Sequence, residues 1–232
     1  VALNAYITMK ISFANNLANI SEKVSGSDVD DITSTIGLDK RISPYYFKGG
    51  MSFGGTCFPR DTFAFNRLSE DLDISTALFD AVDTINQHQD ALLANMVLEK
   101  LKNDPDYSIA ILGMSFKIGT PVIEESVGVK LVNNLLKKLP NTRITAIDPK
   151  AKDNCENYFM DKIEVSSSIS NELNNSEIIV LINKEIDFIE KIYNLEPNKN
   201  IVIIDCWRVL DLNKIHKNIE LIQWAKYKGE KK

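Results

Sequence analysis

The sequence predicts an α/β protein in two parts, an all-helical domain followed by a doubly wound domain built on a parallel sheet. Two observations lead to this fold class. Up to residue 102 the apolar residues recur at helical spacing or stand within loops. Beyond residue 106, short apolar runs alternate with segments of helical composition, as in parallel strands joined by crossover helices. The polar, proline-containing segment Asn103-Asp104-Pro105-Asp106 separates the two patterns, so we expect domains at 1–104 and 105–232.

The first domain is predicted to contain four helices, over residues 1–24, 29–36, 59–71 and 75–102. Ser27 or Asp28 is placed to cap the second helix, Pro59 to open the third, and Ser75 to cap the fourth. The segment KGGMSFGGTCFP contains four glycines and one proline. We therefore expect a structured loop between the second and third helices.

The second domain is predicted to contain five strands, over residues 108–113, 143–147, 178–182, 201–205 and 219–223. The alternation with helical segments indicates a Rossmann-like sheet. Gly113 ends the first strand, but no GxGxxG turn accompanies it. This domain is therefore not expected to bind a dinucleotide.

Composition excludes several classes of protein. The 232 residues are 44% hydrophobic and 25% charged, which is typical of a globular chain, and the net charge of −5 provides no positive field for nucleic acid. Three widely separated cysteines fit neither a disulfide framework nor a metal site, and no apolar run has the length of a membrane span. We expect a cytoplasmic protein without a bound metal. Because the chain opens in a helical pattern without Met, we expect it to be part of a longer protein.

The most informative stretch is Phe53-Gly54-Gly55-Thr56-Cys57-Phe58-Pro59-Arg60-Asp61. Cys57 stands just before a predicted helix, where free N–H groups and the helix dipole favour a thiolate nucleophile. Asp61 follows one turn later, within range to act as a base or to position water. Covalent catalysis is one interpretation. A buried structural cysteine beside a flexible loop is the other.

The phrase FGGTCFPRD, preceded by LNAYITMKISFANN and followed by ILGMSFK and VIIDCWRVLD, resembles the nucleotide-sugar dehydrogenases, the UDP-glucose/GDP-mannose dehydrogenase family. The motifs occur in the family's order over nearly the whole chain. The resemblance implies oxidation of a sugar C6 alcohol to a carboxylate, with two NAD reduced and an enzyme thioester between the two steps. It also implies that the NAD-binding Rossmann domain lies upstream, so that this chain is inactive alone.

The same resemblance assigns roles to individual residues. Cys57 matches the nucleophile, Asp61 the acid that positions water, and Asn4 an asparagine that hydrogen-bonds the reacting oxygen. Residues matching the family's substrate-binding positions are Arg41, Tyr46, Phe47, Lys48, Gly50, Phe53, Gly54, Phe116, Lys117 and Arg208. Among them, Arg41 matches an arginine that crosses a dimer interface. Glu124 departs from the pattern, because the family commonly has an arginine there that reaches towards NAD.

These implications lead to a UDP-sugar of the glucose type as substrate and to a homodimer. The long apolar helices 1–24 and 75–102 favour the homodimer independently, because they need a further surface to bury against. GDP-mannose is an alternative substrate within the same chemistry. A module that binds nucleotides or mediates assembly without catalysis is an alternative from another class.

Overall fold

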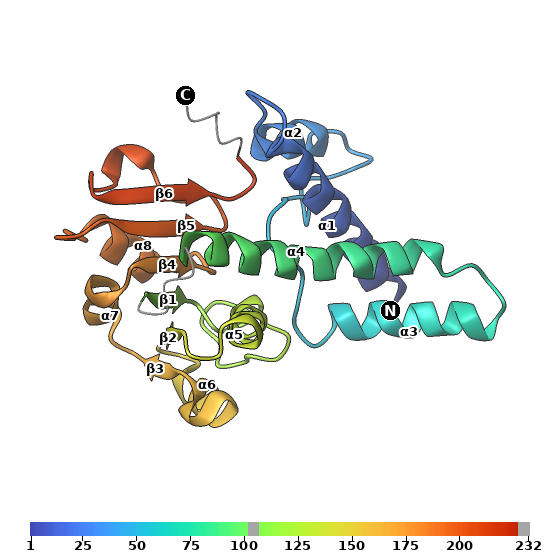
Figure 1. Ribbon diagram of the computed structural model, residues 1–232. Helices are drawn as coiled ribbons and strands as arrows, with labels where there is room; N and C mark the ends of the chain where they lie inside the picture. The colour runs from blue at the N-terminus through green and yellow to red at the C-terminus, as the bar shows by residue number, and fades with distance from the viewer. Residues whose placement is uncertain (102–106, 227–232) are drawn as a thin grey trace. The chain divides into compact units, whose positions relative to one another are not determined.

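The structure is a computed structural model that describes residues 1–101 and 107–226 (Figure 1). The described residues form two compact units, one of residues 1–90 with 224–226 and one drawn from 91–223. The division falls within the long helix α4, Ala77–Leu101, which contributes to both units. The predicted break at residues 103–106 and the predicted helix end at Lys102 lie outside the described residues.

The first unit contains helices in all four predicted places: α1 (Ala2–Ser21), α2 (Val29–Gly37), α3 (Phe58–Asp71) and α4. Asp28 begins α2, because its carboxylate accepts a hydrogen bond from the Asp30 amide at 2.9 Å. Pro59 stands in the first turn of α3, where its missing N–H costs nothing. The sequence therefore predicts this unit's elements well, and the connection between α2 and α3 is a loop without helix or strand.

Helix α1 turns its small and polar residues inward. Its buried positions are Ala5, Thr8, Ser12, Ala14, Asn15, Ala18 and Ser21. Its bulky apolar side chains are largely exposed, among them Leu3, Tyr6, Phe13 and Ile20. The helical spacing of the apolar residues is thus confirmed, but the stripe they form is not the face that packs within this chain.

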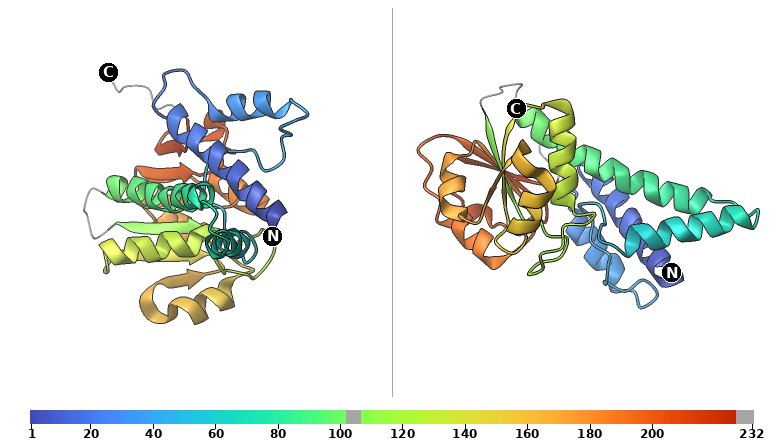
Figure 2. Two further views of the ribbon diagram at one scale, coloured as in Figure 1. Left: turned by 90° about the vertical axis from the view of Figure 1, so that its right-hand side faces the viewer. Right: turned by 90° about the horizontal axis from the view of Figure 1, so that it is seen from below.

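The second unit is a six-stranded parallel sheet in the order β3-β2-β1-β4-β5-β6. The strands are β1 (Ser108–Leu112), β2 (Arg143–Ile147), β3 (Glu164–Ser166), β4 (Ile178–Leu181), β5 (Ile201–Asp205) and β6 (Ile219–Gln223). The connecting helices are α5 (Val127–Lys138), α6 (Lys152–Phe159), α7 (Ile169–Asn175) and α8 (Ile186–Tyr193). Helices cover both faces of this sheet (Figure 2), so its central strands are buried and uniformly apolar.

Two details of the sheet differ from the prediction. The prediction did not include the short edge strand β3, because the three residues of this strand are partly exposed and contain no apolar run. The connection between β5 and β6 contains only a 3-10 turn, Leu212–Lys214, and no crossover α-helix. The strand order reverses between β1 and β4, and the carboxyl ends of these strands define the edge where open α/β sheets bind ligands.

Candidate functional site

Cys57 stands at the start of α3 and is exposed. Its carbonyl accepts the Asp61 amide at 2.9 Å, which closes the first turn of the helix. Gly55, two residues earlier, has φ +79°, a left-handed conformation that glycine adopts without strain. The chain thus turns sharply into a helix that begins at an accessible thiol. The interpretation of Cys57 as a buried structural cysteine is therefore wrong.

Asp61 and Asn4 meet through a direct hydrogen bond. The Asn4 Nδ2 atom donates to Asp61 Oδ2 at 2.7 Å and thereby joins α1 to the first turn of α3. The Arg60 Nε atom donates to the other carboxylate oxygen at 2.9 Å. Although the Asp61 carboxyl is buried, the hydrogen bonds from Asn4 and Arg60 lower its pKa, so it is ionised at neutral pH. Asn4 and Asp61, to which the resemblance assigns separate roles, are therefore bonded directly to each other.

The glycine-rich loop that leads to Cys57 is held by three buried amide side chains. Asn15 of α1 accepts from the Gly50 amide at 2.9 Å and donates to the Met51 carbonyl at 3.1 Å. Asn86 of α4 accepts from the Phe53 amide at 2.7 Å and donates to the Phe53 carbonyl at 3.0 Å. Gln89 donates to the Gly50 carbonyl at 2.9 Å. The backbone donors of Gly50 and Phe53 are consequently used inside the protein.

Sequence reasoning missed these amides. Each stands on the inward face of its helix at a position that a simple helical pattern assigns to the core. A sequence reader could have found them by noting Asn and Gln residues on an otherwise core-facing side of a helix. Buried side-chain amides are hydrogen-bonded, so such residues indicate backbone groups that need partners. Gly49 adds a steric reason for the loop's composition, since a Cβ there would lie 2.4 Å from the Ala14 carbonyl oxygen.

Two predicted substrate-binding side chains are packed inside the first unit. Phe47 is buried and stacks on Phe13, with ring centroids 6.1 Å apart. Phe53 is also buried, and its ring meets the edge of Phe58 at 6.3 Å. Tyr46 is exposed in a left-handed conformation with φ +55°, and its ring also contacts Phe58. Of the three aromatic residues of the set that lie in the first unit, Tyr46 is therefore the one exposed to solvent.

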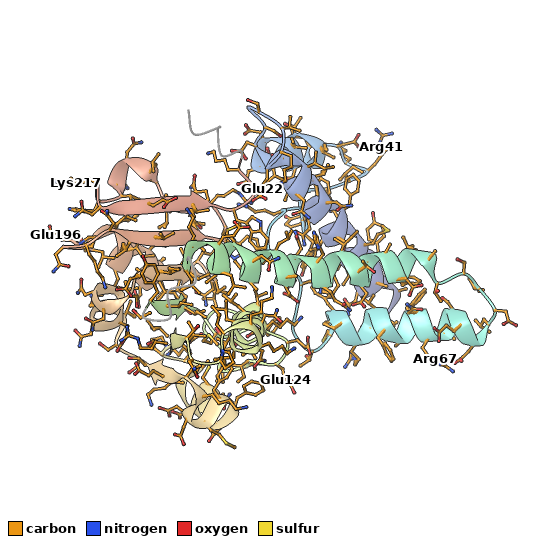
Figure 3. The ribbon with its side chains drawn as sticks, viewed as in Figure 1. Glu22, Arg41, Arg67, Glu124, Glu196 and Lys217 are labelled. Atoms are coloured by element: carbon orange, nitrogen blue, oxygen red, sulfur yellow. The ribbon has the colours of Figure 1, made fainter. Side chains whose placement is uncertain are left out.

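The charged and glycine positions of the set lie on the surface or in the loop backbone. Lys48 is exposed and forms an ion pair with Asp30 at 3.7 Å. Arg41 is exposed on the loop after α2, where it pairs with Asp39 at 2.6 Å (Figure 3). Gly54 is half-buried and directly precedes Gly55, where the chain turns towards the exposed thiol.

Lys10 of α1 anchors the loop that carries Arg41. Its ammonium donates to the carbonyls of Ile42, Ser43 and Tyr45 at 2.7, 2.8 and 2.6 Å. These three bonds occupy all the donors of the ammonium. Burial lowers the pKa of Lys10.

The second group of predicted residues lies at the carboxyl edge of the sheet. Phe116 and Lys117 are exposed on the segment that follows β1. That segment is fixed by Asp148, whose Oδ2 atom accepts the Met114 and Ser115 amides at 2.9 and 2.8 Å. Oδ1 of Asp148 accepts two further backbone amides, at 3.0 and 3.1 Å. Dinucleotide-binding domains carry a ribose-binding acid at the position of Asp148. Here the Asp148 carboxylate instead accepts hydrogen bonds from four backbone amides.

Arg208 follows β5 in a left-handed conformation with φ +58°. The buried Asp205 holds this turn, since its carboxylate accepts the Trp207 amide at 3.1 Å and the Leu210 amide at 2.8 Å. Trp207 donates from Nε1 to the Ile182 carbonyl at 2.8 Å, which ties the turn to the end of β4. Arg208 and the Phe116–Lys117 pair therefore stand on loops at the same edge of the sheet. Glu124, the departure from the family pattern, is exposed on the loop after β1 (Figure 3).

Comparison with known proteins agrees with this arrangement. Residues 1–88 match the central domain of the UDP-glucose/GDP-mannose dehydrogenase family, and residues 110–212 match the family's UDP binding domain. A UDP-glucose 6-dehydrogenase of Rickettsia bellii is 31% identical over 91% of this chain and 49% of its own length. The UDP-glucose 6-dehydrogenase YwqF of Bacillus subtilis is 32% identical over 78% of this chain and 40% of its own.

The fold is also shared with a solved structure. A UDP-glucose dehydrogenase from Pyrobaculum islandicum superimposes with a TM-score of 0.85 and 26% identity, over 98% of this chain and 50% of that one. The chain thus spans about half the length of the relatives it matches. Within the described part of the chain, no helix combines the length and apolarity needed to cross a membrane. With both of its domains matched in the family's order, the chain belongs to the UDP-glucose/GDP-mannose dehydrogenase family.

Proposed function

We propose that this chain is the central and nucleotide-binding part of an NAD-dependent dehydrogenase that oxidises the C6 alcohol of a UDP-sugar of the glucose type to the uronic acid. The observation that carries the proposal is the exposed Cys57 at the start of α3, one turn before the Asn4–Asp61 pair. The names of the relatives support the reaction, and their length, twice that of this chain, makes it a property of a longer protein.

NAD would accept the electrons of both oxidation steps, but the second unit is not built to hold it. A dinucleotide needs free backbone N–H groups in a glycine-rich turn after the first strand. Here the Met114 and Ser115 amides donate to Asp148. We therefore assign the cofactor to an upstream Rossmann domain of the whole protein, and this chain alone is expected to be inactive.

The chain's own residues suit the covalent part of the reaction. The Cys57 sulfur adds to the C6 aldehyde, and oxidation of the resulting thiohemiacetal leaves a thioester on the sulfur. Water then attacks the thioester carbon, the C–S bond breaks, and the carboxylate and free thiolate are released. Asn4 contributes an amide donor for the oxygen on C6, and the ionised Asp61 orients the attacking water.

The nucleophile is tested by Cys57→Ser in a protein extended to the length of the relatives. The variant is expected to form no uronic acid, measured by chromatography of the sugar nucleotide after incubation with NAD. Cys155→Ala is the matched control, because Cys155 is buried in the other unit. Undiminished acid formation by the Cys57 variant would remove it from the nucleophile role.

The substrate class is tested by calorimetric titration of the present chain with UDP and GDP in parallel. Binding of UDP that weakens with Lys117→Ala supports a UDP-sugar, and preferential binding of GDP would favour GDP-mannose. If the chain binds nucleotide but the extended protein with Cys57 intact forms no uronic acid from either sugar nucleotide, a module without catalysis is the better description.

We further propose a homodimer in the cytoplasm. The exposed apolar side chains of α1, including Leu3, Tyr6, Phe13 and Ile20, form a surface that water disfavours and a second copy would bury. The three cysteines are free thiols, as a reducing compartment requires. Light scattering after size-exclusion chromatography is expected to give twice the chain mass. A stable monomer at micromolar concentration would contradict the dimer.

A further inference from the structure

The loop that follows α2, residues 38–47, holds two residues in backbone conformations that side chains disfavour. Ser43 has φ +68° and Tyr46 has φ +55°, so both lie in the left-handed region although neither is a glycine. Such conformations persist only where the surrounding structure fixes them, and they concentrate at functional sites. Two predicted substrate-binding residues, Arg41 and Tyr46, stand on this strained 38–47 loop.

The ammonium of Lys10 fixes the strained backbone from α1. Its Nζ atom donates to the carbonyls of Ile42, Ser43 and Tyr45 at 2.7, 2.8 and 2.6 Å. The Ile42 and Tyr45 carbonyls belong to the peptide groups that enter the two left-handed residues, and the Ser43 carbonyl belongs to the group that leaves the first. Because peptide groups are planar, holding them fixes the dihedral angles of the residues that they join.

The charge of Lys10 is used for this purpose alone. Within the described part of the chain no carboxylate pairs with Lys10, and the Asp39 carboxylate of the same loop is bonded to Arg41 instead. The ammonium also lies over the ring of the buried Phe47, 5.5 Å from its centroid. Three carbonyl dipoles and the face of one ring therefore surround the cation.

We infer that Lys10 is a positioning residue for the sugar nucleotide, because its ammonium holds the 38–47 loop in the conformation that presents Arg41 and Tyr46. This inference rests on the proposed function, in which Arg41 and Tyr46 bind the substrate. Arg41 projects outward from the loop (Figure 3), whereas the three donors of Lys10 are all bonded to backbone. Lys10 thus acts through the loop, and the family resemblance assigns it no role.

The expected kinetic signature is a higher KM with little change of kcat. When a binding loop is competent only part of the time, the apparent affinity falls by the competent fraction. At saturating substrate the bound loop is ordered again, so a loss of uniform binding leaves kcat in place. Cys57, Asn4 and Asp61, which carry the proposed chemistry, lie outside the loop.

The test uses proteins extended to the length of the relatives, with kcat and KM measured for UDP-glucose at saturating NAD. Lys10→Met removes the donors and keeps an unbranched chain over Phe47, and Lys10→Arg retains a charge with N–H donors. Lys40→Met is the matched control, because it removes the same charge from an exposed side chain of the same loop that makes no hydrogen bond or ion pair to the described residues. Arg41→Ala tests the loop's role in binding directly. Lys10→Gln replaces Lys10→Met if the apolar variant does not fold.

Lys10→Met is expected to raise KM at least about tenfold, because one hydrogen bond to a charged group has that effect and three are lost. Its kcat is expected to stay within about twofold of the unmodified protein. Lys10→Arg is expected to recover most of the affinity, and Lys40→Met to change neither constant. Lys10→Gln, with two N–H donors, is expected to give an intermediate KM.

Hydrogen exchange of the present chain tests the ordering of the loop without substrate. The Ile42 and Ser43 amides each donate to the Asp39 carbonyl at 2.9 Å. In Lys10→Met both are expected to exchange at least about tenfold faster. The Ile32 amide of α2, which donates to the Asp28 carbonyl at 3.2 Å, is expected to keep its rate.

Four results would overturn the inference. If Lys10→Met lowers the thermal midpoint and kcat but leaves KM unchanged, Lys10 only stabilises the fold. If Lys10→Arg is as impaired as Lys10→Met, charge and donors do not position the loop. If Arg41→Ala raises KM and Lys10→Met does not, the inference fails while the proposed function stands. If neither raises KM, or the extended protein forms no uronic acid, the proposed role of the loop fails and the inference fails with it.

Discussion

The buried amides behind the glycine loop predict an unequal pair of destabilising substitutions. Asn86→Leu preserves the side-chain shape but removes both hydrogen bonds to Phe53, leaving one backbone donor and one acceptor buried without partners. Gln89→Met removes one hydrogen bond, to the Gly50 carbonyl. It also removes the Gln89 Oε1 atom, which is itself buried without a partner.

The magnitudes follow from these counts. A net hydrogen bond contributes about 0.5–1.5 kcal/mol, and a buried backbone group left unpaired adds a penalty of about 1–3 kcal/mol. We expect Asn86→Leu to reduce the free energy of unfolding of the first unit by about 2–4 kcal/mol. For Gln89→Met the expected loss is about 0–1.5 kcal/mol, because the removed acceptor offsets the lost donor.

Hydrogen exchange of the loop amides is the appropriate assay, because a chain of two units need not unfold in one step. In Asn86→Leu, the exchange rate of the Phe53 amide is expected to rise at least about thirtyfold, which corresponds to 2 kcal/mol. In Gln89→Met it should change less than about tenfold. Equal effects of the two substitutions, or full protection of Phe53 in Asn86→Leu, would refute the anchoring role.

Two further predictions concern thiols and pH. Burial raises the pKa of Cys155 to about 12 and also raises the pKa of Cys206, so a thiol reagent at pH 8 is expected to label one cysteine of the native chain, Cys57, and all three after unfolding. Rapid labelling of two cysteines in the native chain would contradict this. Burial of Glu177 is outweighed by hydrogen bonds from Lys199 and Ser108, which bring its pKa down to about 2. Because its pKa is lower in the folded than in the unfolded state, ionised Glu177 stabilises the fold above the unfolded pKa of about 4.5, and this stabilisation is lost as pH falls towards 2. The thermal midpoint of Glu177→Gln should therefore change less with pH between those limits than that of the unmodified chain.

The elements were predictable because their signals are local. Asp28 caps α2 and Pro59 lies in the first turn of α3, each through contacts within a few residues. The apolar runs of the other five strands, β1, β2, β4, β5 and β6, were also predictable, because strands covered on both faces are largely hydrophobic in sequence. Strand β3 escapes this rule, since it is an edge strand of three partly exposed residues.

The sequence motif predicted which residues belong to the site but not how they contact one another. The position of Cys57 before a proline-started helix indicates a thiol at a helix start, which the structure confirms as exposed. The hydrogen bond between Asn4 and Asp61 joins residues 57 positions apart, and the Asn86–Phe53 bonds span 33. Contacts at such separations depend on how the helices pack, and helical spacing alone does not encode them.

Both units use the same physical device to shape a loop. In the first, Asn15 and Asn86 bond the backbone of the glycine loop; in the second, Asp148 and Asp205 accept the amides of the turns after β1 and β5. A side chain bonded to backbone from the interior fixes a loop without occupying its outer surface. The outer surface then stays available for a substrate, and a loop held in advance loses little entropy when the substrate binds. This explains why buried polar residues concentrate behind the two segments to which the proposed reaction assigns its chemistry.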